Sequence, residues 1–72
     1  MHMKDWTVVY KSQISSRAEI VKSVLVDRTI DAVIINKKDS TLHLNNGQIE
    51  VLVQKSQVLE AMKIINDEIT FD

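Results

Sequence analysis

Two short segments of the chain carry side chains that could bind an anion. The first is KSQISSR at residues 11–17, which brings basic side chains and two serines to the expected start of a helix. The free amides and the positive dipole end of a helix N-terminus favour a negatively charged ligand. The second is NKKDS at residues 36–40, where two lysines stand among hydrogen-bonding partners. The candidate ligand-binding residues are Lys11, Ser15, Ser16, Arg17, Asn36, Lys37, Lys38, Asp39 and Ser40.

Each of these segments also has a simpler structural interpretation. Serines at the start of a helix are more often caps for the backbone amides than ligands. Paired lysines beside a turn are more often the solvated shoulder of a hairpin, because turns require polar residues. The NNG at residues 45–47 is typical of a tight hairpin turn, since Asn-Gly accepts positive backbone angles. Hairpin formation is therefore the expected structural role of this loop, and binding is a hypothesis that its location permits.

The residue types needed for catalysis or metal binding form no recognisable pattern. The chain has no cysteine and a single glycine, which excludes a thiolate metal cluster and a glycine-rich phosphate loop. His43 has no second imidazole near it in the sequence, and the carboxylates Asp67 and Glu68 stand at an expected helix end. We therefore predict no catalytic residue, no metal ligand and no cofactor, and we expect that the protein is not an enzyme.

Length and charge limit the remaining function classes. Seventy-two residues can bury one core, so residues 3–72 are expected to form a single domain. The opening MHM is typical of a cloning remnant, which leaves residues 1–2 outside site arguments. A formal net charge of −1 argues against nucleic-acid binding, which normally needs a basic face. The lack of cysteine, of a signal peptide and of an apolar run near the roughly 20 residues of a membrane span favours a cytoplasmic location.

The spacing of apolar residues predicts three strands and two helices. DWTVVYK is rich in β-branched and aromatic residues, as strands are. SSRAEIVKSVLVDR changes to helical spacing, with Ser16 and Glu19 in the pattern of a capping box. The second helix is expected to be capped by Ser56 and to bury a stripe of Val58, Ala61, Met62 and Ile65. The expected elements are strands at 5–11, 30–37 and 48–54, helices at 15–28 and after Ser56, and a segment at 68–71 that suits either a final strand or a helix end.

This order of elements favours an α+β fold in which both helices cover one face of one sheet. The order is β-α-β-β-α with or without a closing strand, which is the ferredoxin-like split β-α-β arrangement. A right-handed crossover sets the second strand parallel to the first, and the hairpin returns the third strand antiparallel, so we expect a mixed sheet. In this topology the segments at 11–17 and 36–47 emerge at the same end of the sheet and become neighbours.

The expected strands carry apolar residues on both faces, although two helices can cover only one of them. In the second strand Ile30, Ala32 and Ile34 form one side, while Val33 and Ile35 occupy the other. The candidate interface residues on the uncovered face are Val9, Val33, Ile35 and Leu52. Such a patch would expose on the order of a few hundred Å², and at about 25 cal/mol per Å² its burial could contribute several kcal/mol before the costs of association. In the alternative case, sheet twist or the C-terminal segment hides part of the patch.

Four segments also resemble a known family in their order and spacing. They are AEIVKSVL at 18–25, IDAVIINKKDS at 30–40, GQIEVLV at 47–53 and VLEAMKII at 58–65, within a match that covers nearly all of residues 8–66. They are similar to a small bacterial family described as prokaryotic signal-transducing proteins, a domain of unknown function with a ferredoxin-like, PII-like fold. The resemblance implies that the hairpin between the second and third strands is the functional loop, and it carries no established catalytic residues. The chain departs from the family at Thr29, where glycine is common, and at Gln54, where proline is common, and both departures concern how an element ends.

Two functions from different classes remain open. The favoured one is a non-enzymatic regulatory, signal-transducing or protein-interaction module. Its open sheet face would pair with itself, as a homo-oligomer, or with another protein, and its hairpin loop would contact the target. The alternative is a sensor of a small anion or nucleotide that uses the segments at 11–17 and 36–40. Neither nucleic acid nor a membrane is expected as a partner.

Overall fold

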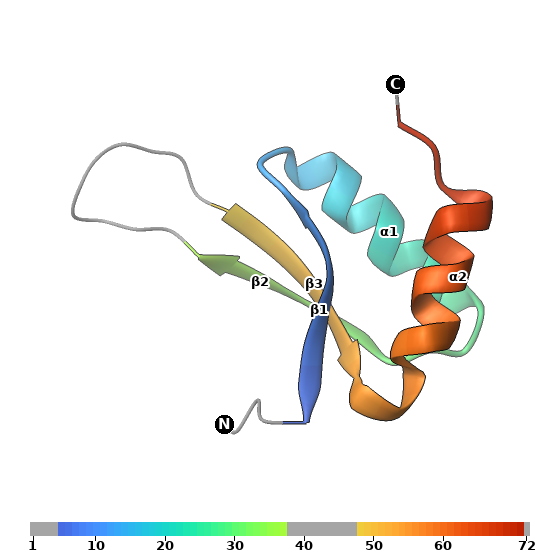
Figure 1. Cartoon of the computed structure of the whole chain (residues 1–72). Helices are drawn as coiled ribbons and strands as arrows, with labels where there is room; N and C mark the ends of the chain where they lie inside the picture. The colour runs from blue at the N-terminus through green and yellow to red at the C-terminus, as the bar shows by residue number, and fades with distance from the viewer. Residues whose placement is uncertain (1–4, 38–47, 72) are drawn as a thin grey trace.

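The structure is a computed structural model that describes residues 5–37 and 48–71. The elements, in chain order, are β1 (Trp6–Ser12), α1 (Ser15–Asp27), β2 (Ala32–Lys37), β3 (Gln48–Gln54), the short 3₁₀ turn η1 (Lys55–Gln57) and α2 (Val58–Glu68). Across these described residues the fold is α+β, with three strands and two helices (Figure 1). Neither described helix combines the length and the apolar character that a membrane crossing requires.

The three strands form one antiparallel sheet in the order β1-β3-β2. β3 lies in the middle, where Leu52 stands between Val8 of β1 and Val33 of β2. The expectation of a mixed sheet was wrong. β1 and β2 do run in the same direction, but β3 separates them, and each hydrogen-bonded pair of strands is therefore antiparallel. Of the two interpretations for 68–71, the helix end is correct: α2 continues through Glu68, and residues 69–71 belong to no strand.

Both helices pack on the same face of the sheet, as Figure 1 shows. α1 presents Ala18, Val21 and Leu25 to the sheet, and their spacing of three and four residues is the period that keeps side chains on one side of a helix. The predicted helical pattern of this segment is confirmed. The buried core cluster consists of Ala18, Val21, Leu25, Ile30, Ala32, Ile49, Val51, Val53, Ala61 and Ile64.

A β-bulge in β1 changes which side chains face this core. The pairing with β3 shifts between Val8 and Tyr10, which leaves Val9 as the extra residue. Val9 and Tyr10 both pack against the core cluster. The expectation that Val9 shares a face with Leu52 was therefore wrong. It assumed an unbroken strand, whereas the bulge turns Val9 towards the helices and places Val8 across from Leu52.

The helices begin without the serine caps that the sequence predicts. The N-cap position of α1 is Ile14, which makes no side-chain cap hydrogen bond, so the expected capping box of Ser16 and Glu19 was wrong. The chain turns into α1 through Ser12 instead, whose Oγ accepts a hydrogen bond from the Ile14 amide at 2.9 Å. Ser56 lies within η1, so it does not cap α2, which begins at Val58 after Gln57. The 3₁₀ turn η1 therefore contains the residue that was expected to cap the helix.

The apolar stripe of α2 also differs from the prediction at two residues. Ala61 is fully buried, and Val58 and Ile65 pack against the core. Ile64, which the predicted stripe omitted, is buried, whereas Met62 is 50% exposed. The side of α2 that packs on the sheet is therefore centred on Ala61 and Ile64, and Met62 lies outside it.

α1 ends in a Schellman motif with a threonine in the left-handed conformation. The amide of Thr29 donates to the Val26 carbonyl, and the amide of Ile30 donates to the Leu25 carbonyl, each at 2.9 Å. Thr29 has a φ of 64°, the only positive φ among the described non-glycine residues. Ile30 and Leu25, which the motif brings together, are both buried in the core. The resemblance identified this same position as one where glycine is common, and its backbone angle explains why glycine would suit it.

Candidate functional site

The two candidate segments start from the same end of the sheet, as predicted, whereas most of the second one, residues 38–47, lies outside the described residues. Ser12 at the end of β1 and Asn36 near the end of β2 both pair with Ile49 of β3. The segment that leads into α1 and the segment that leaves β2 therefore start from the same end of the sheet (Figure 1). The candidate residues Lys38, Asp39 and Ser40 lie outside the described residues.

At the start of α1, Arg17 makes specific contacts within the chain. Its guanidinium lies 4.9 Å from the centre of the Phe71 ring, in a cation–π arrangement. The Phe71 ring in turn lies 6.0 Å from the Tyr10 ring, and the two ring planes are inclined at 50°. The C-terminal segment thus returns to the beginning of α1, beside Ser15 and Ser16, which are both exposed. A structural role as a clamp for the chain end accounts for Arg17 without a ligand.

Lys11 lies on a different side of the molecule from the helices. In the pairing of β1 with β3, the partner of Lys11 is Glu50. Glu50 lies two residues from Leu52, on the same face of the sheet, which the helices leave uncovered. Side chains of adjacent strand residues alternate between faces, and Tyr10 packs against the core, so Lys11 points to the uncovered face. The candidate cations therefore divide, with Lys11 on one face of the sheet and Arg17 on the other.

The uncovered face carries a row of aliphatic side chains that crosses all three strands. Val8, Leu52 and Val33 are successive partners across the sheet, and the next row consists of Lys11, Glu50 and Ile35. Leu52 in the middle strand is only 5% exposed, while Val8, Val33 and Ile35 are half-buried. Glu50 is 9% exposed, so a carboxylate lies close beside the aliphatic row. Sequence reasoning identified three of the four aliphatic residues and missed Val8.

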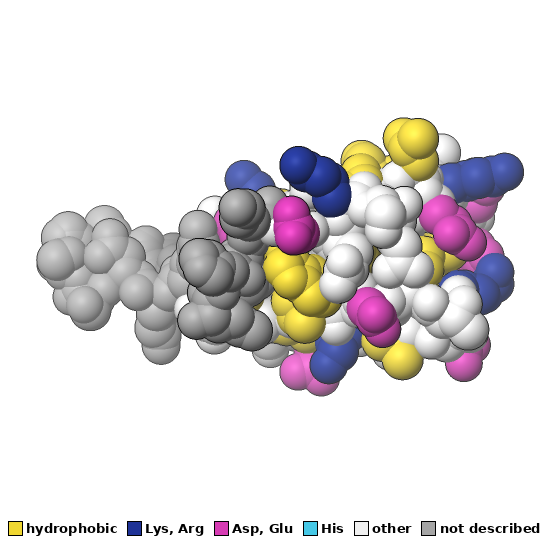
Figure 2. Space-filling model, turned by 90° about the horizontal axis from the view of Figure 1, so that it is seen from below, with side chains coloured by type: hydrophobic (Ala, Val, Ile, Leu, Met, Phe, Trp, Pro, Cys, Tyr) yellow, Lys and Arg dark blue, Asp and Glu magenta, His cyan; other side chains and the backbone are white. Residues whose placement is uncertain are grey.

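Apolar side chains are also exposed on the helical side, where the sequence pattern did not single them out. Leu59 on α2 is 86% exposed, and Val26 on α1 is 51% exposed. Figure 2 shows that, in the view from below, apolar side chains gather in separate patches with charged side chains between them. The surface seen in that view is therefore mixed, and specificity of any contact would depend on the charges beside each patch.

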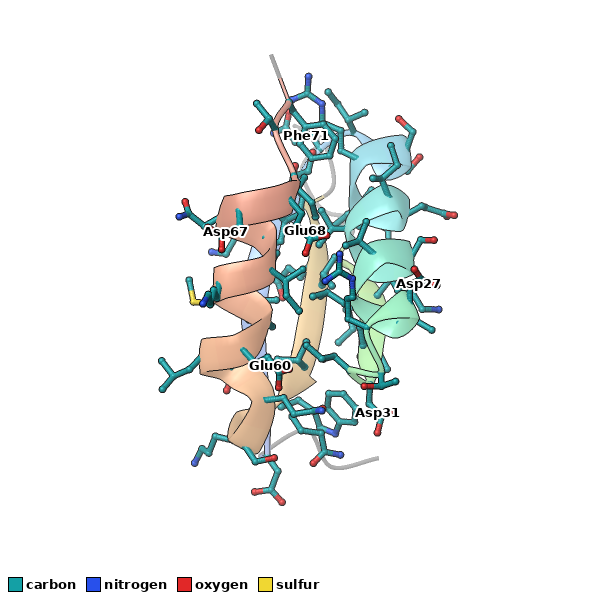
Figure 3. All side chains as sticks on the ribbon, turned by 90° about the vertical axis from the view of Figure 1, so that its right-hand side faces the viewer. Asp27, Asp31, Glu60, Asp67, Glu68 and Phe71 are labelled. Carbon is teal, nitrogen blue, oxygen red and sulfur yellow. The ribbon has the colours of Figure 1, made fainter. Side chains whose placement is uncertain are left out.

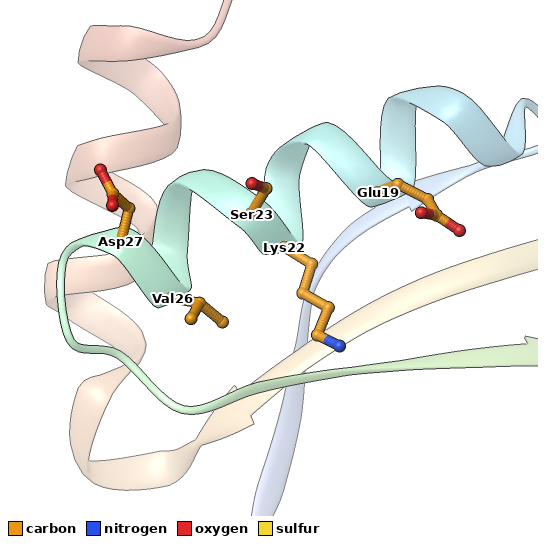
Figure 4. Close-up of a pocket in the computed structure, with 5 residues that line it drawn as sticks. All are labelled: Glu19, Lys22, Ser23, Val26 and Asp27. Carbon is orange, nitrogen blue, oxygen red and sulfur yellow. The ribbon is translucent and has the colours of Figure 1, made fainter.

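The outer side of α1 borders an open hollow of about 400 Å³. It is lined by Glu19, Lys22, Ser23, Val26 and Asp27, which recur at helical spacing along one side of α1. Figure 4 shows Lys22 and Val26 pointing from the helix towards the ribbon of β2. The hollow contains two carboxylates and one ammonium group without an enclosed, water-excluding wall, so it suits surface contact better than chemistry on a small molecule.

The acidic side chains on the helices do not converge on a common point. Figure 3 shows Asp27, Asp31, Glu60 and Asp67 spread along the two helices and the segment after α1. Glu68 forms an ion pair with Arg28, which ties the C-terminal ends of α1 and α2 together. Over residues 5–37 and 48–71, no three His, Cys, Asp or Glu side chains group closely enough to hold a metal ion. His43 lies outside the described residues.

Comparison with known proteins adds no relative: no protein-family model, no curated protein and no solved structure matches this chain.

Proposed function

We propose that this chain is a non-enzymatic protein-interaction module of bacterial signal transduction, with a ferredoxin-like, PII-like fold, and that it acts in the cytoplasm. The strand order β1-β3-β2, with both helices on one face, supports the fold assignment. The segments at 18–25, 30–40, 47–53 and 58–65, which resemble the signal-transducing family, support the functional class. The module binds a second copy of itself or another protein through its uncovered sheet face.

The single observation that carries this proposal is the aliphatic row of Val8, Leu52 and Val33. The row crosses the whole sheet on the face opposite the two helices, and Ile35 extends it along β2. Leu52 is buried within this row, and the half-buried Val8, Val33 and Ile35 leave apolar surface on the face away from the helices that a partner could cover. A partner that covers the row would bury it between two layers, as a standard two-layer domain buries its sheet.

The alternative function, a sensor of small anions, receives less support from the same side chains. Arg17 is engaged with Phe71, and Lys11 lies on the far face of the sheet from α1. The two cations nearest the start of α1 are thus not presented together to one ligand. Among the described candidate residues, the exposed Ser15, Ser16 and Asn36 remain compatible with anion binding.

Sedimentation velocity over a range of concentrations tests the proposal. We expect the weight-average mass to rise above the 8.2 kDa of one chain and the Val8→Lys variant to lower it at the same concentration. Lysine at this half-buried position places a charge in the aliphatic row, which a partner would have to desolvate. Leu59→Lys is the matched control, because Leu59 is 86% exposed on α2 and should leave the mass unchanged. A Val8→Lys protein that associates as strongly as the wild type would contradict a role for this face in self-association.

A further inference from the structure

β2 has a free outer edge. It is one of the two edge strands of the sheet, and within residues 5–37 and 48–71 no strand pairs with its outer side. In an antiparallel ladder every second residue turns its N–H and C=O towards one neighbour and the next residue turns them the other way. Half of the backbone groups of Ala32–Lys37 therefore face outwards, and another extended backbone is the partner that satisfies them most directly.

The two edges of the sheet differ in how well they could accept a further strand. β1 carries the bulge at Val9 and the charged Lys11, and bulges and lysines are the devices by which edges avoid pairing. β2 pairs with β3 over six consecutive residues without a shift in register. Its sequence AVIINK holds no proline and no charged residue before Lys37. β2 is thus a regular, β-branched edge whose one charged residue, Lys37, stands at its end, and such an edge pairs readily.

The hollow on α1 adds a surface of mixed charge on the side that faces β2. Lys22 and Val26 point from α1 towards β2, and Val26 is 51% exposed (Figure 4). Glu19 and Asp27 stand at the two ends of the hollow, with Lys22 between them. A surface with both signs can complement itself, whereas a surface of one sign would repel a second copy.

We propose that β2 pairs antiparallel with β2 of a second copy of this chain and joins the two sheets into one sheet of six strands. Antiparallel pairing of two identical strands has two-fold symmetry, so one edge serves both copies and the assembly closes as a dimer. The symmetry axis stands perpendicular to the sheet, which leaves the helices of both copies on one side. The two uncovered faces then join on the other side.

This inference deepens the proposed function by naming the partner as a second copy and the edge as its point of contact. The dimer brings the hollows of two α1 helices to the same seam, where Lys22 of each copy meets acidic side chains of the other. The formal net charge of −1 per chain opposes dimerisation only weakly. Because only one strand edge and one helix flank take part, we expect an interface smaller than the roughly 1,200–2,000 Å² of a standard one and a weak dimer that forms at high protein concentration.

Charge-reversal variants in the Val8→Lys background separate this dimer from association through the sheet face. Val8 lies on β1, away from the β2 edge, so Val8→Lys protein should still reach twice 8.2 kDa at millimolar concentration. Adding Lys22→Glu makes the hollow wholly acidic, and adding Glu19→Lys with Asp27→Lys makes it wholly basic. Each should weaken the dimer about tenfold or more, and an equimolar mixture of the two should form a dimer again. All three residues are exposed, and circular dichroism checks that each variant stays folded.

Isotope-filtered NMR identifies the contact itself. In a mixture of labelled and unlabelled chains we expect intermolecular NOEs between protons of residues 33–36 of the two copies. The β2 amides should also exchange with solvent more slowly as the concentration rises. A Val8→Lys protein that stays at 8.2 kDa, or a dimer without these NOEs, would overturn edge pairing and leave the face proposal standing. A strict monomer whose β2 amides gain protection only when an extended peptide is added would assign the edge to another protein and overturn self-pairing.

Discussion

Replacing Thr29 by glycine is expected to stabilise the protein by about 0.5–1 kcal/mol. Thr29 has a φ of 64°, the left-handed conformation at the end of α1. A residue with a side chain loses roughly 1–2 kcal/mol in this conformation, and β-branching makes the crowding worse. Glycine avoids that clash, although its greater freedom in the unfolded chain takes back about 0.5–1 kcal/mol. The substitution also removes the hydrogen bond that the Thr29 hydroxyl donates to the Arg28 carbonyl at an exposed site, which is a small loss.

The expected gain comes from the backbone angle of residue 29. The backbone hydrogen bonds of the Schellman motif do not involve the Thr29 side chain. The amides of Thr29 and Ile30 still reach the carbonyls of Val26 and Leu25 when glycine is present. A gain of 0.5–1 kcal/mol corresponds to a rise in Tm of about 2–8 °C in a domain of this size. Thermal and urea unfolding followed by circular dichroism measures both quantities.

Lys63→Gly is the matched control for Thr29→Gly. Lys63 is exposed in the middle of α2, where the backbone is helical, so glycine should lower the free energy of unfolding there by about 0.5–1 kcal/mol. The two substitutions to glycine must therefore act in opposite directions. If Thr29→Gly lowers Tm, or if both variants shift Tm in the same direction, the conformational explanation for residue 29 is refuted.

Two further substitutions test the packing of the domain. Phe71→Ala should lower the free energy of unfolding by about 1–2 kcal/mol, because it removes both the ring contact with Tyr10 and the cation–π contact with Arg17; an unchanged urea midpoint would show that the chain end is not held there. Leu25→Ala should cost about 2–5 kcal/mol, because Leu25 is fully buried between α1 and the sheet. In a domain of 72 residues this corresponds to a fall in Tm of at least about 8 °C, while Val26→Ala at the exposed neighbouring position should change stability by less than about 0.5 kcal/mol.

The local pattern of the sequence was sufficient for the elements and for most of the core. Helical spacing placed Ala18, Val21, Val24, Leu25 and Arg28 on one side of the first helix, because the period of a helix depends only on its own backbone. The first two and Leu25 are buried and Val24 is half-buried, whereas Arg28 at the helix end is exposed. The composition of residues 48–54 was likewise enough to predict β3 with the bounds that the structure has. The element order further implied that the end of β1 and the end of β2 lie at the same end of the sheet.

Tertiary structure decided the features that depend on a partner distant in sequence. The bulge that turns Val9 inwards arises in the pairing of β1 with β3, more than forty residues along the chain, so no period within β1 could reveal it. The same holds for Arg17, which looked like a free cation until Phe71 was brought back against it. Ser16 and Ser56 had the right residue type for caps, but the path by which the chain enters each helix decides which residue stands at the cap. Local backbone preferences thus determined which segments became strands and helices, and contacts between segments determined which side chains remain available to a partner.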